Sequence, residues 1–163
     1  MKLTKIETPP QIRTDTTVGT RIFAGGTIIY GDTGWRNIAS WLDPSVKLNS
    51  NLGKAKVRRI GDIVYFDLKL EVVTETTSIL TGVPLGFRAG SDFPTDAGIT
   101  TAPTPAAGAS ALRSYTAPGV IYAGDKPLRT GATTPLQAGI TMAWTLSYTT
   151  PDPWPTSLPG NPA

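Results

Sequence analysis

Residues 54–73, KAKVRRIGDIVYFDLKLEVV, contain the strongest structural signal in the chain. From Ile63 onward, apolar side chains alternate with polar or amphipathic ones. The apolar face holds Val64, Phe66, Leu68, Leu70 and Val72, and the other face holds Tyr65, Asp67, Lys69 and Glu71. A period of two kept over this length is the signature of a half-buried β-strand. Burying each of these apolar side chains contributes about 1.5–3 kcal/mol before conformational entropy is counted, so we expect the strand to form the centre of the core.

A two-residue turn precedes this strand. Gly61 and Asp62 separate it from the β-prone residues 57–60, VRRI. Because glycine at the first central position suits a type II′ turn, we predict that the two flanking segments form a β-hairpin.

A second alternating stretch extends from Gly139 to Thr149. Its apolar face consists of Ile140, Met142, Trp144, Leu146 and Tyr148. The period of two predicts another half-buried strand, in which Trp144 serves packing. We expect this strand to pair with the one that begins at Ile63.

The composition favours an all-β protein. Gly (17) and Pro (15) are frequent among the 163 residues, and no window of helical length has apolar side chains at helical spacing. Gly-Asp pairs follow apolar runs at three points, which fits a meander or a sandwich. We predict a β domain at residues 21–150, an extended N-terminal arm at 1–20 and a proline-rich C-terminal arm at 151–163.

Both predicted arms hold apolar residues that one domain would struggle to cover. Residues 1–20 are polar, rich in threonine and broken by Pro9-Pro10, which is typical either of a solvated terminus or of an arm that docks on a neighbouring protein. Residues 151–163 contain five prolines, which exclude them from a sheet interior and favour polyproline II. Trp154 and Leu158 therefore need burial on the surface of their own subunit or of another.

The residue types exclude several chemistries. The chain has no cysteine and no histidine, which removes disulfides, thiolate metal sites and Ser–His or Cys–His catalysis. Its carboxylates lie mostly in turns, as Asp32 and Asp62 do, or on strand faces. Nothing in their spacing indicates the converging pair that a glycosidase uses. We predict no catalytic residue, no metal site and no cofactor.

The sequence also indicates neither a membrane nor a nucleic acid as a partner. The N-terminus lacks the apolar core of a secretory signal, and no run approaches transmembrane length. Five basic residues lie between Lys47 and Arg59, but no aromatic residue is interleaved with them. Because Lys54, Lys56 and Arg58 are spaced by two, they are expected on a solvated strand face.

Residues 89–117 are rich in Ala, Gly, Pro, Ser and Thr. They are expected to form either a long exposed loop or loosely alternating edge strands, and long loops are often functional. Arg88 and Tyr115 at the edges of this segment are candidate ligand contacts. Trp35 is a third, because it lies beside a turn where it could stack on a sugar, although packing is the alternative.

Four stretches carry a resemblance to a family. They are GTRIFAGGTIIYGDTGWRNI, VRRIGDIVYFDLKLEV, PLGFR and the terminal WPTSLPGNPA. Together they resemble minor tail proteins and tail fibres of tailed bacteriophages, especially phages of actinobacterial hosts. The resemblance covers roughly residues 19–88 and 139–163, and it leaves residues 89–138 unmatched.

The resemblance implies a trimeric head of antiparallel, jelly-roll-like β-sandwich subunits, made in the host cytoplasm and located in the virion tail. Such a protein would be no enzyme. It would contact other phage virion proteins through the N-terminal arm and present loops to host cell-wall glycans. Two alternatives stay open: a capsid or tail decoration protein without a host ligand, and a depolymerase of cell-wall polysaccharide.

Overall fold

The computed structural model describes residues 10–15, 18–24, 26–89, 93–101, 109–117, 120–125 and 135–163. Within these residues the chain is all-β, and its one helical element is the 3₁₀ turn η1 (Ala39–Trp41). The strands are β1 (Gln11–Asp15), β2 (Gly19–Ala24), β3 (Thr27–Asp32), β4 (Arg36–Asn37), β5 (Val46–Leu48), β6 (Lys54–Ile60), β7 (Ile63–Val72), β8 (Ser78–Thr81), β9 (Phe93–Thr101), β10 (Ala109–Ala117), β11 (Val120–Asp125) and β12 (Thr141–Thr149).

The predicted hairpin is confirmed as β6 and β7. Ile60 pairs with Ile63 across the two-residue turn. Gly61 has φ 56°, whereas Asp62 does not have a positive φ, as a type II′ turn requires. The predicted apolar face of β7 is fully buried, while its other face is half-buried.

Strand β12 pairs with β7 along its whole length, as predicted. The register runs from Thr141 opposite Glu71 to Thr149 opposite Ile63. The rings of Phe66 and Tyr148 lie 5.8 Å apart between centroids. The aligned strands place their apolar faces on the same side of the sheet, where they form the centre of the core.

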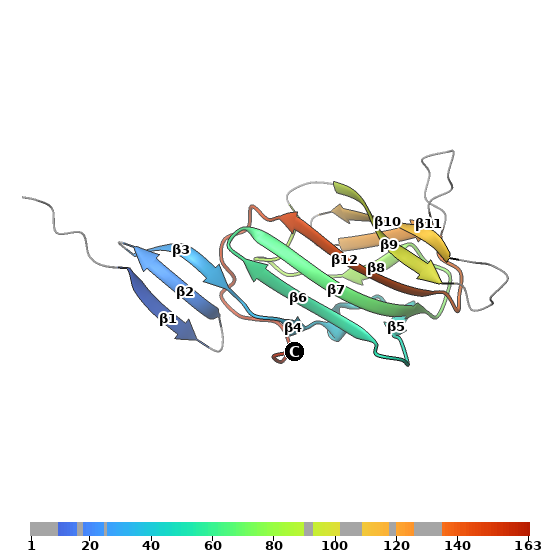
Figure 1. Cartoon of the computed structure of the whole chain (residues 1–163), viewed down its shortest axis with the longest axis horizontal. Helices are drawn as coiled ribbons and strands as arrows, with labels where there is room; N and C mark the ends of the chain where they lie inside the picture. The colour runs from blue at the N-terminus through green and yellow to red at the C-terminus, as the bar shows by residue number, and fades with distance from the viewer. Residues whose placement is uncertain are drawn as a thin grey trace, which may run out of the picture.

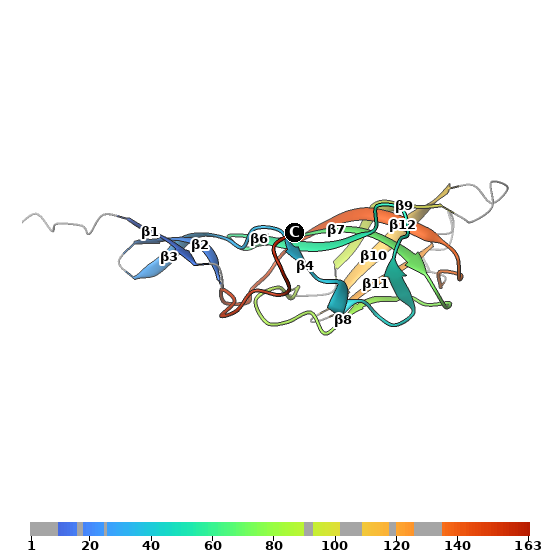
Figure 2. The ribbon, with the colours of Figure 1, turned by 90° about the horizontal axis from the view of Figure 1, so that it is seen from below.

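All strand pairs are antiparallel, and the main hydrogen-bonded path has the order β1-β2-β3-β6-β7-β12-β9-β10-β11-β8. In Figure 2, β7 and β12 lie along one side of the body and β8 along the other. Leu42, just after η1, forms an isolated bridge with Leu80 of β8. The sheet therefore curls around until its last strand meets the segment that follows β4.

The curled sheet encloses one hydrophobic core. The core consists of Ile38, Val46, Ala55, Val57, Val64, Phe66, Leu68, Leu70, Val72, Ile79, Leu80, Val83, Phe87, Ala89, Leu136, Ile140, Met142, Leu146 and Tyr148. Trp41 packs against it and meets Phe87 edge-on, with ring centroids 5.9 Å apart.

The first three strands lie outside this body. Figure 1 shows β1, β2 and β3 as a small sheet that projects from the end where β6 turns into β7. Strand β3 joins the main sheet through a single residue pair, Asp32 opposite Ile60. Residues 11–15, which belong to the predicted N-terminal arm, are thus paired with β2 in a sheet. The domain boundaries at residues 20 and 150 remain a prediction.

Several local expectations are decided by the structure. Residues 89–117, for which a loop and edge strands stayed open, contribute β9 and β10, which lie inside the strand order rather than at its edge. The all-β antiparallel fold is confirmed, whereas the β-sandwich remains a prediction because the strands form one continuous sheet.

The buried face of β7 generates a stability prediction. Phe66 is 1% exposed, so Phe66→Ala should lower the free energy of unfolding by about 3–5 kcal/mol. Tyr65→Ala, on the half-buried outer face, is the matched control and should cost less. Denaturant unfolding of both variants checks this, and a larger loss for Tyr65→Ala would contradict the assignment of faces.

Candidate functional site

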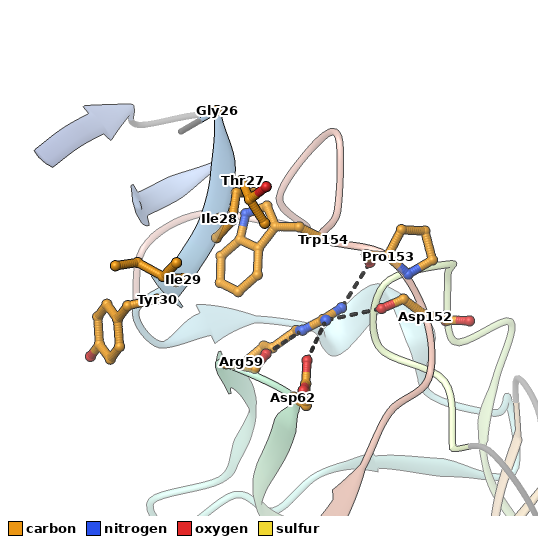
Figure 3. Close-up of a pocket in the computed structure, with 12 residues that line it drawn as sticks. Gly26, Thr27, Ile28, Ile29, Tyr30, Arg59, Asp62, Asp152, Pro153 and Trp154 are labelled. Carbon is orange, nitrogen blue, oxygen red and sulfur yellow. Dashed lines mark hydrogen bonds and ion pairs between the residues drawn. The ribbon is translucent and has the colours of Figure 1, made fainter. Parts of the chain in front are cut away.

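A groove of about 510 Å³ lies where the small sheet meets the body, a size within the usual range of ligand sites. It is bounded by β3, the β6–β7 turn and the start of the C-terminal arm (Figure 3). The lining residues are Gly26, Thr27, Ile28, Ile29, Tyr30, Gly31, Arg59, Gly61, Asp62, Asp152, Pro153 and Trp154.

The C-terminal arm lies on its own subunit, one of the two positions expected from its apolar residues. Trp154 donates its indole N–H to the carbonyl of Val18 at 2.9 Å. The ring is so close to Gly31 that a Cβ at Gly31 would collide with it. Further along, Arg36 donates from Nε to the carbonyl of Pro159 at 2.9 Å. The arm thus spans from the small sheet to β4.

Arg59 at the end of β6 holds the wall of the groove together. It is 2% exposed, and its guanidinium donates to four backbone carbonyls. Nε donates to Gly61 at 2.8 Å, and Nη2 donates to Asp152 at 3.0 Å. Nη1 donates to both Gly86 at 2.6 Å and Pro153 at 2.8 Å. One side chain therefore fixes the β6–β7 turn, the loop after β8 and the arm.

Burial of this cation is partly offset by its surroundings. Burial lowers the pKa of Arg59, while the carboxylates of Asp62 and Asp152 oppose that shift. Asp62 Oδ1 lies 3.6 Å from Nη2, and the guanidinium carbon lies 5.1 Å from the centre of the Trp154 ring. Because its hydrogen bonds go to carbonyl oxygens of the chain, Arg59 acts as a structural cation.

Asp152 fastens the loop after β8 to the arm. Its Oδ2 accepts from the backbone N–H groups of Gly86 and Arg88, at 2.8 Å and 3.2 Å. The Arg88 guanidinium meets the same carboxylate with two bonds of 3.1 Å and 3.0 Å. The bond from Arg88 and those from the two backbone N–H groups lower the pKa of Asp152, although burial opposes them.

A second carboxylate joins β3 to β6. Arg58 donates to both oxygens of Asp32, at 3.0 Å and 2.6 Å. The hydrogen bond from Arg58 lowers the pKa of Asp32, burial opposes it, and the N–H of Gly34 adds to the lowering. Asp32 therefore remains ionised and bound in the fold.

The outer side of the groove is open. Ile29 is 58% and Tyr30 41% exposed, and the side chain of Asp62 is 80% exposed. The N–H of Gly61 donates to the carbonyl of Gly31 at 2.8 Å, on the edge of β3 away from β2. Beyond this bond, no described residue pairs with that edge along Thr27–Tyr30. The groove is therefore an open strand edge with apolar walls and one accessible carboxylate.

The three candidate ligand residues come from separate places. Trp35 is half-buried before β4, and its carbonyl accepts from the N–H of Ala163 at 3.0 Å. Arg88 is committed to Asp152 by the ion pair described above. Tyr115 lies in β10 opposite Tyr122, but its side chain lies outside the described residues. No contact joins any two of them in the described part of the chain, so their ligand roles remain predictions.

Sequence reasoning missed the residue on which the groove depends. Arg59 is one of the five basic residues between Lys47 and Arg59, of which only Lys54, Lys56 and Arg58 were assigned to a face of a strand. Lys54, Lys56 and Arg58 do lie on the half-exposed face of β6, while Ala55, Val57 and Arg59 are buried. The sequence did contain a sign of this burial. Ala55, Val57 and Arg59 are spaced by two, so the alternation of a strand places Arg59 on the same face as the two apolar residues.

The chain matches no protein-family model and no curated protein. Among the described residues, no helix is long and apolar enough to cross a membrane. The same residues contain no group of three or more side chains suited to bind a metal ion. Because no family model and no curated protein matches, the resemblance to phage tail proteins stays a prediction.

The role of Arg59 generates a second prediction. Arg59→Ala should lower the free energy of unfolding by about 3–5 kcal/mol, because it leaves buried carbonyls unpaired. Arg59→Lys should recover only part of the loss, since an ammonium cannot reproduce the planar fork. Lys56→Ala, on the outer face of the same strand, is the control and should change stability by less than about 1 kcal/mol. Equal losses for Arg59→Ala and Lys56→Ala would contradict this role.

The lowered pKa of Asp152 predicts acid sensitivity. A carboxyl group whose pKa is lower in the folded state than in the unfolded state stabilises the fold. The full stabilisation is present at pH values above the unfolded-state pKa, which is 3.8 for Asp152. This stability is lost as the pH falls through the folded-state pKa. Asp152→Asn should therefore be less stable than wild type at pH 7, and the difference should shrink below about pH 4. Denaturant midpoints at both pH values check this, and a difference independent of pH would contradict it.

Proposed function

We propose that this protein is a non-enzymatic component of a tailed-phage virion, namely a short tail fibre or a tail-tip (minor tail) protein. It assembles as a homotrimer and binds host cell-wall glycans through exposed loops. The four resembling stretches support the assignment to phage tails. They include GDTGWR at residues 31–36 and the β6–β7 hairpin.

The observation that supports a role in virion assembly is the projecting sheet of β1, β2 and β3. Ile12 is 72% exposed on β1, and it is aligned with Ile22 of β2 and Tyr30 of β3 on one face. A small sheet with an exposed apolar face gains stability by packing against other protein surface. This supports a protein whose N-terminal part is used in assembly.

The carboxylates support a non-enzymatic role. A glycosidase needs a general acid with a raised pKa beside a second carboxylate. Asp32 and Asp152 instead have lowered pKa values, because each is bound by an arginine. Both carboxylates serve the fold, which argues against a depolymerase that uses either of them as its general acid.

A decoration protein without a host ligand is the second candidate. The observation that favours it is the pairing of Arg88 with Asp152, since a guanidinium held in this way has fewer donors left for a glycan.

Immunogold electron microscopy and a glycan assay test the proposal. Antibody against this chain should label the tails of virions, and purified protein should sediment with host cell walls without releasing reducing ends. Tail labelling without wall binding would select the decoration protein. Labelling of no virion would overturn the proposal, and release of reducing ends lost on changing one carboxylate would establish an enzyme.

A further inference from the structure

The groove beside β3 has the geometry of an acceptor for an added strand. Its lining includes every residue from Gly26 to Gly31. The register with β2 shifts between Tyr30 and Ile28, so the side chains do not alternate strictly at Ile29. Because the lining nevertheless includes every consecutive residue of this stretch, the cavity extends along the length of the strand. Figure 3 shows Ile29 and Tyr30 on one side of β3 and Trp154 on the other.

The partner strand ends before this edge is covered. Strand β6 would continue opposite β3, but it turns back at Gly61 after one residue pair. Thr27–Tyr30 therefore has β2 on one side and the groove on the other. An extended segment placed there would continue the line of β6 and use the open backbone groups of β3, as in β-strand addition.

We propose that residues 2–8 of a second copy of this chain add to β3 as that strand. The segment, KLTKIET, combines β-branched and apolar residues and ends at Pro9-Pro10, which lack N–H groups for further pairing. Lys2 and Lys5 complement the exposed carboxylate of Asp62 at the groove. This inference rests on the proposed assembly of the protein and names its acceptor site.

The topology favours a neighbouring copy as the donor. Gln11 pairs with Phe23, which pairs with Ile28, so the chain enters the small sheet at the edge opposite the groove. A segment from the same chain would first have to cross β2 and β3, which is three strand spacings or about 14 Å. A donor from another copy needs no such crossing. Donation from each subunit to the next closes into a ring when the rotation permits, which suits the expected trimer.

Paired variants test the proposal in the full-length chain. The donor variant is Thr4→Pro with Ile6→Pro, which removes two backbone N–H groups. The acceptor variant is Ile29→Lys with Asp62→Lys, which repels Lys2 and Lys5. Each variant should raise the dissociation constant for self-association at least about tenfold, as measured by sedimentation velocity. The control, Leu48→Lys with Val73→Lys, adds two charges at the opposite end of β7 and should associate as wild type does.

Mixing distinguishes exchange between copies from pairing within one chain. The donor variant keeps an intact groove, and the acceptor variant keeps an intact donor segment. An equimolar mixture should therefore recover one-to-one complexes. Failure of the mixture to associate, or a monomeric wild type, would overturn the proposal, and so would wild-type association of both variants.

A peptide competition needs no variant. The peptide MKLTKIETP, added in excess, should dissociate wild-type oligomers, while a scrambled peptide should not. Oligomers unaffected by the peptide would overturn the proposal. Because these measurements concern mass in solution, they can fail while virion labelling succeeds, and the reverse also holds.

Discussion

The placement of the arm relative to the body depends on one buried cation. Arg59 brings together backbone carbonyls from the β6–β7 turn, the loop after β8 and the C-terminal arm, three segments far apart in the sequence. A guanidinium has five N–H donors in a fixed plane and retains its charge. No other side chain could donate to all of these carbonyls from one position. Removing it would leave several buried acceptors without partners, which is costlier than losing a surface ion pair.

The arginine–carboxylate pairs near Arg59 also join segments that are far apart in the sequence. Asp152 on the arm accepts hydrogen bonds from the Arg88 side chain and from two backbone N–H groups of the loop after β8. Asp32 accepts from Arg58 beside the junction of β3 with β6. A small sheet that meets the body through one residue pair needs such additional ties. Trp154 supplies the apolar part by lying against Gly31 and reaching the carbonyl of Val18. The projecting sheet is thus held by the arm as well as by β6.

The central strands could be predicted from sequence because their information is local. The alternation from Ile63 to Val72 gives the buried face, and Gly61 gives the turn, without knowledge of distant residues. The role of Arg59 could not be predicted in the same way. Its partners are backbone carbonyls, which every residue type has, so the sequence holds no sign of which ones it meets. Only its position in the buried phase of β6 distinguished it from Arg58.

The prolines of the arm explain why the groove stays open although the arm lies beside it. Pro151, Pro153 and Pro155 alternate along this segment, so one whole edge of it lacks the N–H donors that a strand partner must offer. The arm is therefore suited to accept hydrogen bonds from Arg59 and to pack Trp154, while its proline-bearing edge cannot pair with β3. Any segment that completes the edge of β3 must bring its own N–H groups, and the donor must therefore be a different stretch of polypeptide.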